Sequence, residues 1–147
     1  MRGRAEPGSI AKTVQGDDVH FDVHWSPLSL ADRHDIAARV PAVAGIYELY
    51  AELTTRLQKF ALEGAWYGGL RAAIRAATDA EVATDVDRRA LLARWRCLYR
   101  YCAVDTREDL FDLLHALRAT GSEGVASASG RFASVSVSER GELGTYS

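Results

Sequence analysis

The chain has 147 residues, of which 48% are apolar and 26% are charged, and its formal net charge is −2. This length fits one domain with its own core, and this composition excludes a largely disordered protein. The weak negative charge excludes strong unspecific attraction of the whole surface to nucleic acid, although it is compatible with a local basic patch.

The start of the chain is polar and basic, and no apolar run follows it. We therefore expect residues 1–9 to be disordered, and we expect neither a signal peptide nor a membrane span. The expected location is the cytoplasm. Residues 10–147 are predicted to form a single domain.

Apolar and polar residues alternate from residue 19 to residue 25, which predicts a half-buried strand that pairs with residues 10–14. The polar face of this strand carries His20, Asp22 and His24. Two imidazoles and a carboxylate can bind zinc or iron, whereas any solvent-facing strand can show the same pattern without a metal. A histidine metal site is therefore an alternative to an ordinary solvated face.

A proline at position 27 ends this strand, and residues 29–40 are predicted to form a short helix. Ser29 and Asp32 have the spacing of a capping box, which predicts that the helix starts at Ser29. Pro41 ends the helix, because a residue before proline disfavours the helical conformation.

Residues 45–69 fit two interpretations. Apolar residues between Ile46 and Ala61 recur at helical spacing, which predicts an amphipathic helix. The same stretch also fits two strands that are rich in aromatic residues, bounded by glycines and joined by a turn at residues 54–56. The pattern alone slightly favours the helix.

Two short helices are predicted next, at residues 70–79 and 86–95, followed by a strand at residues 97–104. This strand contains the two cysteines of the chain, which are too few for a disulfide framework or a thiolate zinc site. Because Cys97 and Cys102 lie five positions apart, they point to opposite faces of the strand and cannot pair locally. We expect both to be buried, reduced thiols.

A capping box between Thr106 and Asp109 predicts a helix at residues 109–118, which Gly121 is expected to close. After a flexible connector, residues 131–146 alternate and predict a hairpin or a single strand that pairs with the N-terminal one. The expected fold is therefore α+β, with accessory strands at residues 10–25 and 131–146.

Short motifs enclose the ambiguous stretch: Gly45-Ile46-Tyr47 opens it, Trp66-Tyr67-Gly68-Gly69 closes it, and two arginines lie on the helix that follows. This ordered set resembles the GIY-YIG nuclease superfamily, and the resemblance covers about half of the chain, at residues 42–120. It implies a small antiparallel sheet with three central strands flanked by helices. The resemblance therefore favours the hairpin for residues 45–69.

The resemblance also implies roles for particular side chains. Tyr47 and Tyr67 correspond to the tyrosine pair that activates water or relays its proton, and Arg71 or Arg75 corresponds to the arginine that binds the phosphate. Gly68 and Gly69 open a helix whose amide groups would bind a phosphate of the substrate.

The family's magnesium ligand is a glutamate on a later helix, and the corresponding inward position here is Leu114. Glu108 and Asp112 are the nearest carboxylates and are the candidate ligands for Mg²⁺. Without a metal ligand the fold would keep its shape and lose its chemistry. We therefore expect a non-catalytic module that retains the nuclease architecture and binds nucleic acid or protein; the alternative is a Mg²⁺-dependent DNA endonuclease.

The same residue types have structural interpretations as well. Tyrosines in strands are more often core or sheet-face aromatics than catalysts, and the glycine pair also fits a plain turn into a helix. Arginines between Arg71 and Arg100 form a nucleic-acid footprint if several share a face. The acidic residues between them favour a solvated face of mixed charge instead.

Overall fold

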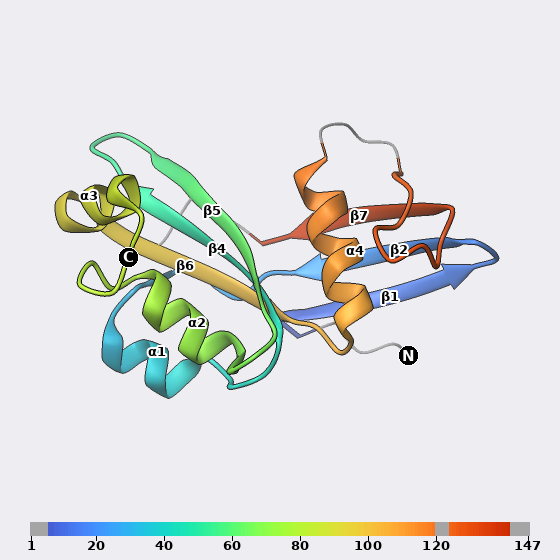
Figure 1. Ribbon diagram of the computed structural model, residues 1–147, viewed down its shortest axis with the longest axis horizontal. Helices are drawn as coiled ribbons and strands as arrows, with labels where there is room; N and C mark the ends of the chain where they lie inside the picture. The colour runs from blue at the N-terminus through green and yellow to red at the C-terminus, as the bar shows by residue number, and fades with distance from the viewer. Residues whose placement is uncertain (1–5, 120–123, 142–147) are drawn as a thin grey trace.

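The computed structural model describes residues 6–119 and 124–141, and these residues form four helices and seven strands (Figure 1). The strands are arranged in two small sheets, which confirms the predicted α+β class. No helix in these two ranges is long and apolar enough to cross a membrane. Of residues 1–9, which were predicted to be disordered, residues 1–5 lie outside the described residues, as do the closing Gly121 and residues 142–146 of the predicted C-terminal strand. Gly8 and Ser9 are ordered instead, because the Gly8 N–H donates to His24 O at 2.6 Å and Ser9 begins a strand.

The larger sheet contains four antiparallel strands in the order β3 (Ser29–Leu30), β6 (Arg96–Ala103), β4 (Gly45–Glu52) and β5 (Leu57–Ala65). Residues 45–65 therefore form a hairpin, and the strand interpretation of this stretch is correct. Every residue of β4 from Gly45 to Ala51 is buried, because both faces of the sheet are covered. The three predicted central strands are β6, β4 and β5, and β3 is an additional strand.

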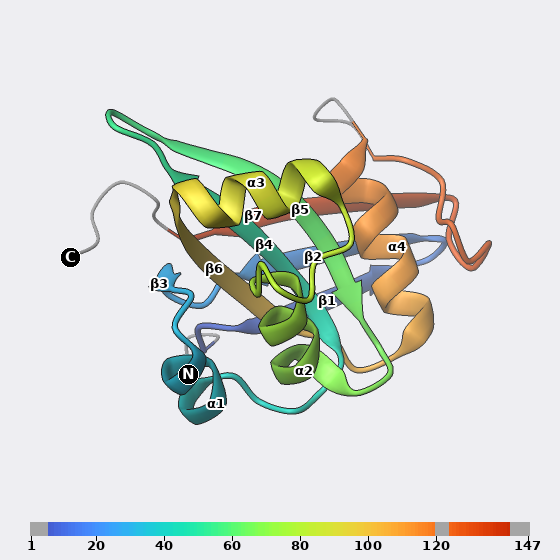
Figure 2. The same cartoon turned by 60° about the vertical axis from the view of Figure 1, so that its left-hand side comes forward.

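Three helices cover one face of this sheet: α1 (Arg33–Arg39), α2 (Gly69–Ala77) and α3 (Val86–Arg94) (Figure 2). Helix α2 buries Leu70 and Ile74, which pack in one core with Tyr47 and Leu49 of β4. Helix α3 has no buried residue and packs on this core through Leu92.

The smaller sheet contains three strands in the order β1 (Ser9–Gln15), β2 (Asp18–His24) and β7 (Ser134–Arg140). Strands β1 and β2 form an antiparallel hairpin, as predicted. Strand β7 runs parallel to β2, so the C-terminal segment takes the second of its two predicted arrangements, a single strand beside the N-terminal hairpin.

Helix α4 (Arg107–Arg118) packs against strands of both sheets (Figure 1). The hydroxyl of Thr106 accepts a hydrogen bond from the Asp109 N–H at 3.1 Å, which confirms the predicted cap. Leu110 of α4 packs in a second core with Ile46 of β4 and with the apolar residues of β2. Adjacent residues of β4 thus enter different cores: Ile46 faces α4, whereas Tyr47 faces α2.

The start of α1 differs from the prediction. The N-cap is Asp32, not Ser29, because the Asp32 carboxylate accepts a hydrogen bond from the Asp35 N–H at 3.1 Å and the helix begins at Arg33. Ser29 belongs to β3 and pairs with Tyr99 of β6. Both residues are good N-caps, and the pairing with β6 decides between them.

Candidate functional site

Tyr47 lies in β4 with only 5% of its surface exposed. Its hydroxyl donates a hydrogen bond to Glu63 Oε1 of β5 at 2.9 Å. Arg88 of α3 donates from two nitrogens to the same carboxylate, at 3.1 Å and 2.9 Å. These three side chains form the Tyr47 cluster, on the wall of a pocket of about 410 Å³ whose apolar lining is mostly alanine.

The electrostatics of the Tyr47 cluster keep its tyrosine neutral. Burial raises the pKa of the Tyr47 hydroxyl, and the neighbouring Glu63 carboxylate raises it further. Burial would also raise the pKa of Glu63, but the hydrogen bonds from Arg88 and Tyr47 outweigh it and hold that pKa below its usual value. Tyr47 is therefore fixed as a hydrogen-bond donor and is a poor base near neutral pH.

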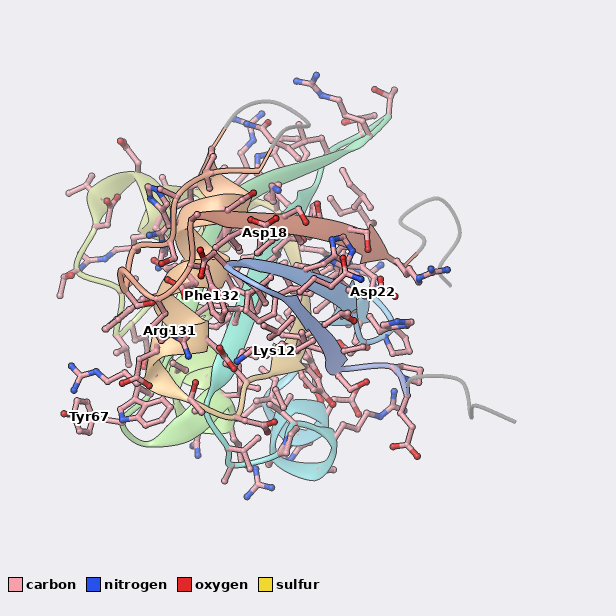
Figure 3. All side chains as sticks on the ribbon, turned by 90° about the vertical axis from the view of Figure 1, so that its right-hand side faces the viewer. Lys12, Asp18, Asp22, Tyr67, Arg131 and Phe132 are labelled. Carbon is pink, nitrogen blue, oxygen red and sulfur yellow. The ribbon has the colours of Figure 1, made fainter. Side chains whose placement is uncertain are left out.

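The second predicted tyrosine has different surroundings. Tyr67 lies in the turn between β5 and α2, is 82% exposed, and projects away from the body of the molecule (Figure 3). Its ring lies 5.9 Å from the guanidinium carbon of Arg107, at the start of α4. The structure therefore does not bring Tyr47 and Tyr67 together.

The two candidate metal ligands are also separated from Tyr47. Asp112 is fully buried on α4, where it accepts hydrogen bonds from Ser129 and Arg131. Helix α4 covers the face of the larger sheet opposite to Tyr47. Glu108 is exposed in the first turn of α4. In the described part of the chain, no three His, Cys, Asp or Glu side chains form a group that could hold a metal ion.

Three of the four residues predicted to bind phosphate, in contrast, share one cavity, which Gly69 does not line. Gly68, Arg71 and Arg75 line a groove of about 470 Å³ along α2, together with Arg33 of α1 and Asp79. Alanines form much of its remaining surface. We call this cavity the arginine groove.

The glycine pair has a structural reason for its composition. Gly68 and Gly69 have φ angles of 78° and 79°, which side-chain-bearing residues rarely adopt. A Cβ atom on Gly69 would also lie 2.8 Å from the backbone carbon of Ala42. The amide of Leu70 already donates to Val43 O at 2.7 Å, so it is not available to a ligand.

The polar face of β2 is occupied by local hydrogen bonds. The two ring nitrogens of His20 lie 2.8 Å from Ser136 Oγ and 3.0 Å from Ser138 Oγ of β7. Asp22 contacts His24, Ser138 and Arg140, and its pKa is lowered by these hydrogen bonds against the effect of its burial. His20, Asp22 and His24 share one face as predicted, but they form no metal-binding group among the described residues.

Two groups of charged residues were missed by sequence reasoning. Glu63 lies directly opposite Tyr47 in the hairpin, so the register would have identified it once the hairpin was known. Arg88 gave no such local signal. The second group surrounds Glu48 of β4, whose carboxylate accepts hydrogen bonds from Arg100 at 2.7 Å, Lys59 at 2.9 Å and Tyr50 at 2.7 Å.

A family model described as "Uncharacterised protein" matches residues 9–147. No curated protein and no solved structure matches the chain.

Proposed function

Because the chain belongs to this family, whose description names no activity, we propose a function from its geometry: a non-catalytic nucleic-acid-binding module with a GIY-YIG-like architecture. One observation supports the proposal. Of the residues that the resemblance assigns to a nuclease site, three of the four candidates for phosphate binding, Gly68, Arg71 and Arg75, line the arginine groove, whereas the candidates for the chemistry lie apart.

The arginine groove has the chemistry of a phosphate site. Arg71 donates from Nε to Val40 O at 2.8 Å, which orients its guanidinium on the groove wall. Within the described residues, the side chains of Arg33 and Arg75 have no hydrogen bond or ion pair. A planar guanidinium without a protein partner binds phosphate oxygens with two hydrogen bonds. Asp79 is the single acidic lining residue, so the groove is locally positive although the net charge is −2.

Hydrolysis of a phosphodiester needs a base and charge stabilisation at the same phosphate. Tyr47 is held neutral by burial and by its hydrogen bond to Glu63, which argues against Tyr47 as the base of a hydrolysis reaction. Mg²⁺ would need Glu108 or Asp112, and Asp112 is already paired with Arg131 on the other side of the sheet. Both points favour binding without cleavage.

Two assays test the proposal. Nicking of a supercoiled plasmid with Mg²⁺ is expected to stay at background for wild type and for Tyr47→Phe. Fluorescence anisotropy with labelled DNA is expected to show binding that weakens with salt. Arg33→Ala and Arg75→Ala should each weaken DNA binding relative to wild type. Each should also lower the slope of log affinity against log salt concentration by about one unit.

Arg56→Ala is the matched control, because Arg56 is exposed in the β4–β5 turn, at the end of the hairpin that is remote from α2. Mg²⁺-dependent nicking that is lost in Tyr47→Phe would overturn the non-catalytic assignment. Absence of DNA binding, or equal losses in Arg56→Ala and Arg75→Ala, would refute the groove as the binding site.

A further inference from the structure

Exposed aromatic side chains gather at the turn between β5 and α2. Tyr67 is 82% exposed, Phe111 on α4 is 46% exposed, and Trp66 is 37% exposed. In Figure 3 the Tyr67 ring stands at the edge of the molecule. Single exposed apolar residues are ordinary, but three large aromatics in two neighbouring segments indicate a binding surface.

A cation joins two of these rings, those of Tyr67 and Phe111. The guanidinium carbon of Arg107 lies 5.9 Å from the centre of the Tyr67 ring and 5.4 Å from that of Phe111. The side chain of Arg107 has no hydrogen bond or ion pair in the described part of the chain, so its N–H groups can donate hydrogen bonds to an anionic ligand. Trp66, Tyr67, Arg107 and Phe111 are called the aromatic patch below.

The aromatic patch adjoins the arginine groove along the chain. Tyr67 directly precedes Gly68, which is the N-cap of α2 and lines the groove. The later lining residues on this helix, which include Arg71 and Arg75, follow at helical spacing and therefore form one stripe along it. A platform of rings thus stands at one end of a row of cations.

We propose that the aromatic patch and the arginine groove together bind single-stranded nucleic acid, an inference that rests on the function proposed above. The phosphates would follow the arginines along α2, and a base would stack on the ring of Tyr67. Single strands expose the flat faces of their bases, whereas a duplex covers them by base stacking. Since every base has such a face, binding would tolerate many sequences.

An acidic protein segment would use the arginines but would gain nothing specific from a flat ring face. Stacking distinguishes the two occupants, because its contribution depends on the ring and not on charge. The exposed ring of Tyr67 also makes it a safe site for substitution, since its removal leaves no internal cavity.

The test is fluorescence anisotropy with a labelled oligothymidylate of about 15 nucleotides and with a duplex of the same length. The single strand is expected to bind more tightly than the duplex. Tyr67→Ala should weaken single-strand binding by about tenfold and leave duplex binding little changed. Tyr67→Phe, which restores a ring, should recover the loss. Val86→Ala is the control, because Val86 is similarly exposed, at 76%, but lies on α3.

Each alternative has its own signature. If the duplex binds as tightly as the single strand, and Arg75→Ala weakens both while Tyr67→Ala weakens neither, this inference is wrong and the proposed function stands. If oligoglutamate at equal charge displaces the single strand as well as unlabelled oligothymidylate does, the surface binds acidic chains and the inference is wrong. If neither nucleic acid binds to the wild type, both proposals fall.

Discussion

Glu48 is the residue whose replacement should destabilise this fold most clearly. Its side chain is 1% exposed in β4, and that of its partner Arg100 is 7% exposed. Arg100 also lies over the rings of Trp25, at 4.6 Å, and Tyr50, at 5.6 Å. Glu48→Ala removes the only carboxylate that pairs with Arg100 among the described residues and leaves the guanidinium buried.

The structure sets the magnitude of this effect. Removing one partner of a buried ion pair costs about 3–5 kcal/mol, because the remaining charge is desolvated without compensation. For a chain of about this size, each kcal/mol lowers Tm by about 2–4 °C, so the expected shift is roughly 6–20 °C. Lys59→Ala removes the other charge on Glu48, but this ammonium is 47% exposed, so the expected loss is only about 0–1 kcal/mol.

Urea unfolding followed by circular dichroism measures the difference. Glu48→Ala should lower the midpoint strongly at an unchanged slope, and Glu48→Gln should fall between Glu48→Ala and wild type because it keeps an acceptor for Arg100. If Glu48→Ala and Lys59→Ala lose the same small amount, Arg100 is hydrated in solution and the reasoning from burial is wrong.

Three further predictions follow from single contacts. Hydrogen bonds from Arg88 and Tyr47 hold the pKa of Glu63 below its usual 4.5, so the stabilisation by this carboxylate is present above that pH and is lost as the pH falls through the lower folded value. The free energy of unfolding, measured by urea titration, should therefore fall less steeply with acid in Glu63→Gln than in wild type. Superimposable pH profiles would contradict this. Cys97 and Cys102 are both buried, and burial raises the pKa of Cys97 to about 12. Neither thiol should therefore react with iodoacetamide in the native protein, and fast labelling without denaturant would disprove this prediction. Gly69→Ala should be more destabilising than Gly130→Ala, because both have a positive φ but only Gly69 has backbone within 3 Å of the new methyl group; equal midpoints would exclude the clash.

The hairpin at residues 45–65 shows what a single sequence could and could not establish. Glycines and aromatic residues at its ends predicted strands, while the apolar spacing favoured a helix. The structure explains the conflict, since β4 is buried on both faces and has no polar side to produce alternation. Helix α4 was simpler to predict, because one face is buried and its cap is local.

The contacts that position the candidate site depend on long-range pairing. Arg88 reaches Glu63 across 25 positions of sequence, and Ser129 and Arg131 reach Asp112 from a loop that follows α4. None of these partners has a local sequence signal. Arg71 and Arg75 line the same groove because they lie one turn apart on one helix, and helical spacing alone places them on one stripe.

This difference between local and long-range placement bears on the proposed absence of catalysis. A phosphate-binding stripe needs one helix and its neighbour, so it persists as long as α1 and α2 stay packed. A hydrolytic centre needs Tyr47 and a carboxylate of α4 beside the same phosphate, yet β4 directs Tyr47 to the α2 face and α4 covers the other face. No substitution on the inner face of α4 brings a carboxylate to Tyr47, since the sheet lies between them. Moving the carboxylate to α3, from which Arg88 already contributes to the Tyr47 cluster, is the arrangement that this topology permits.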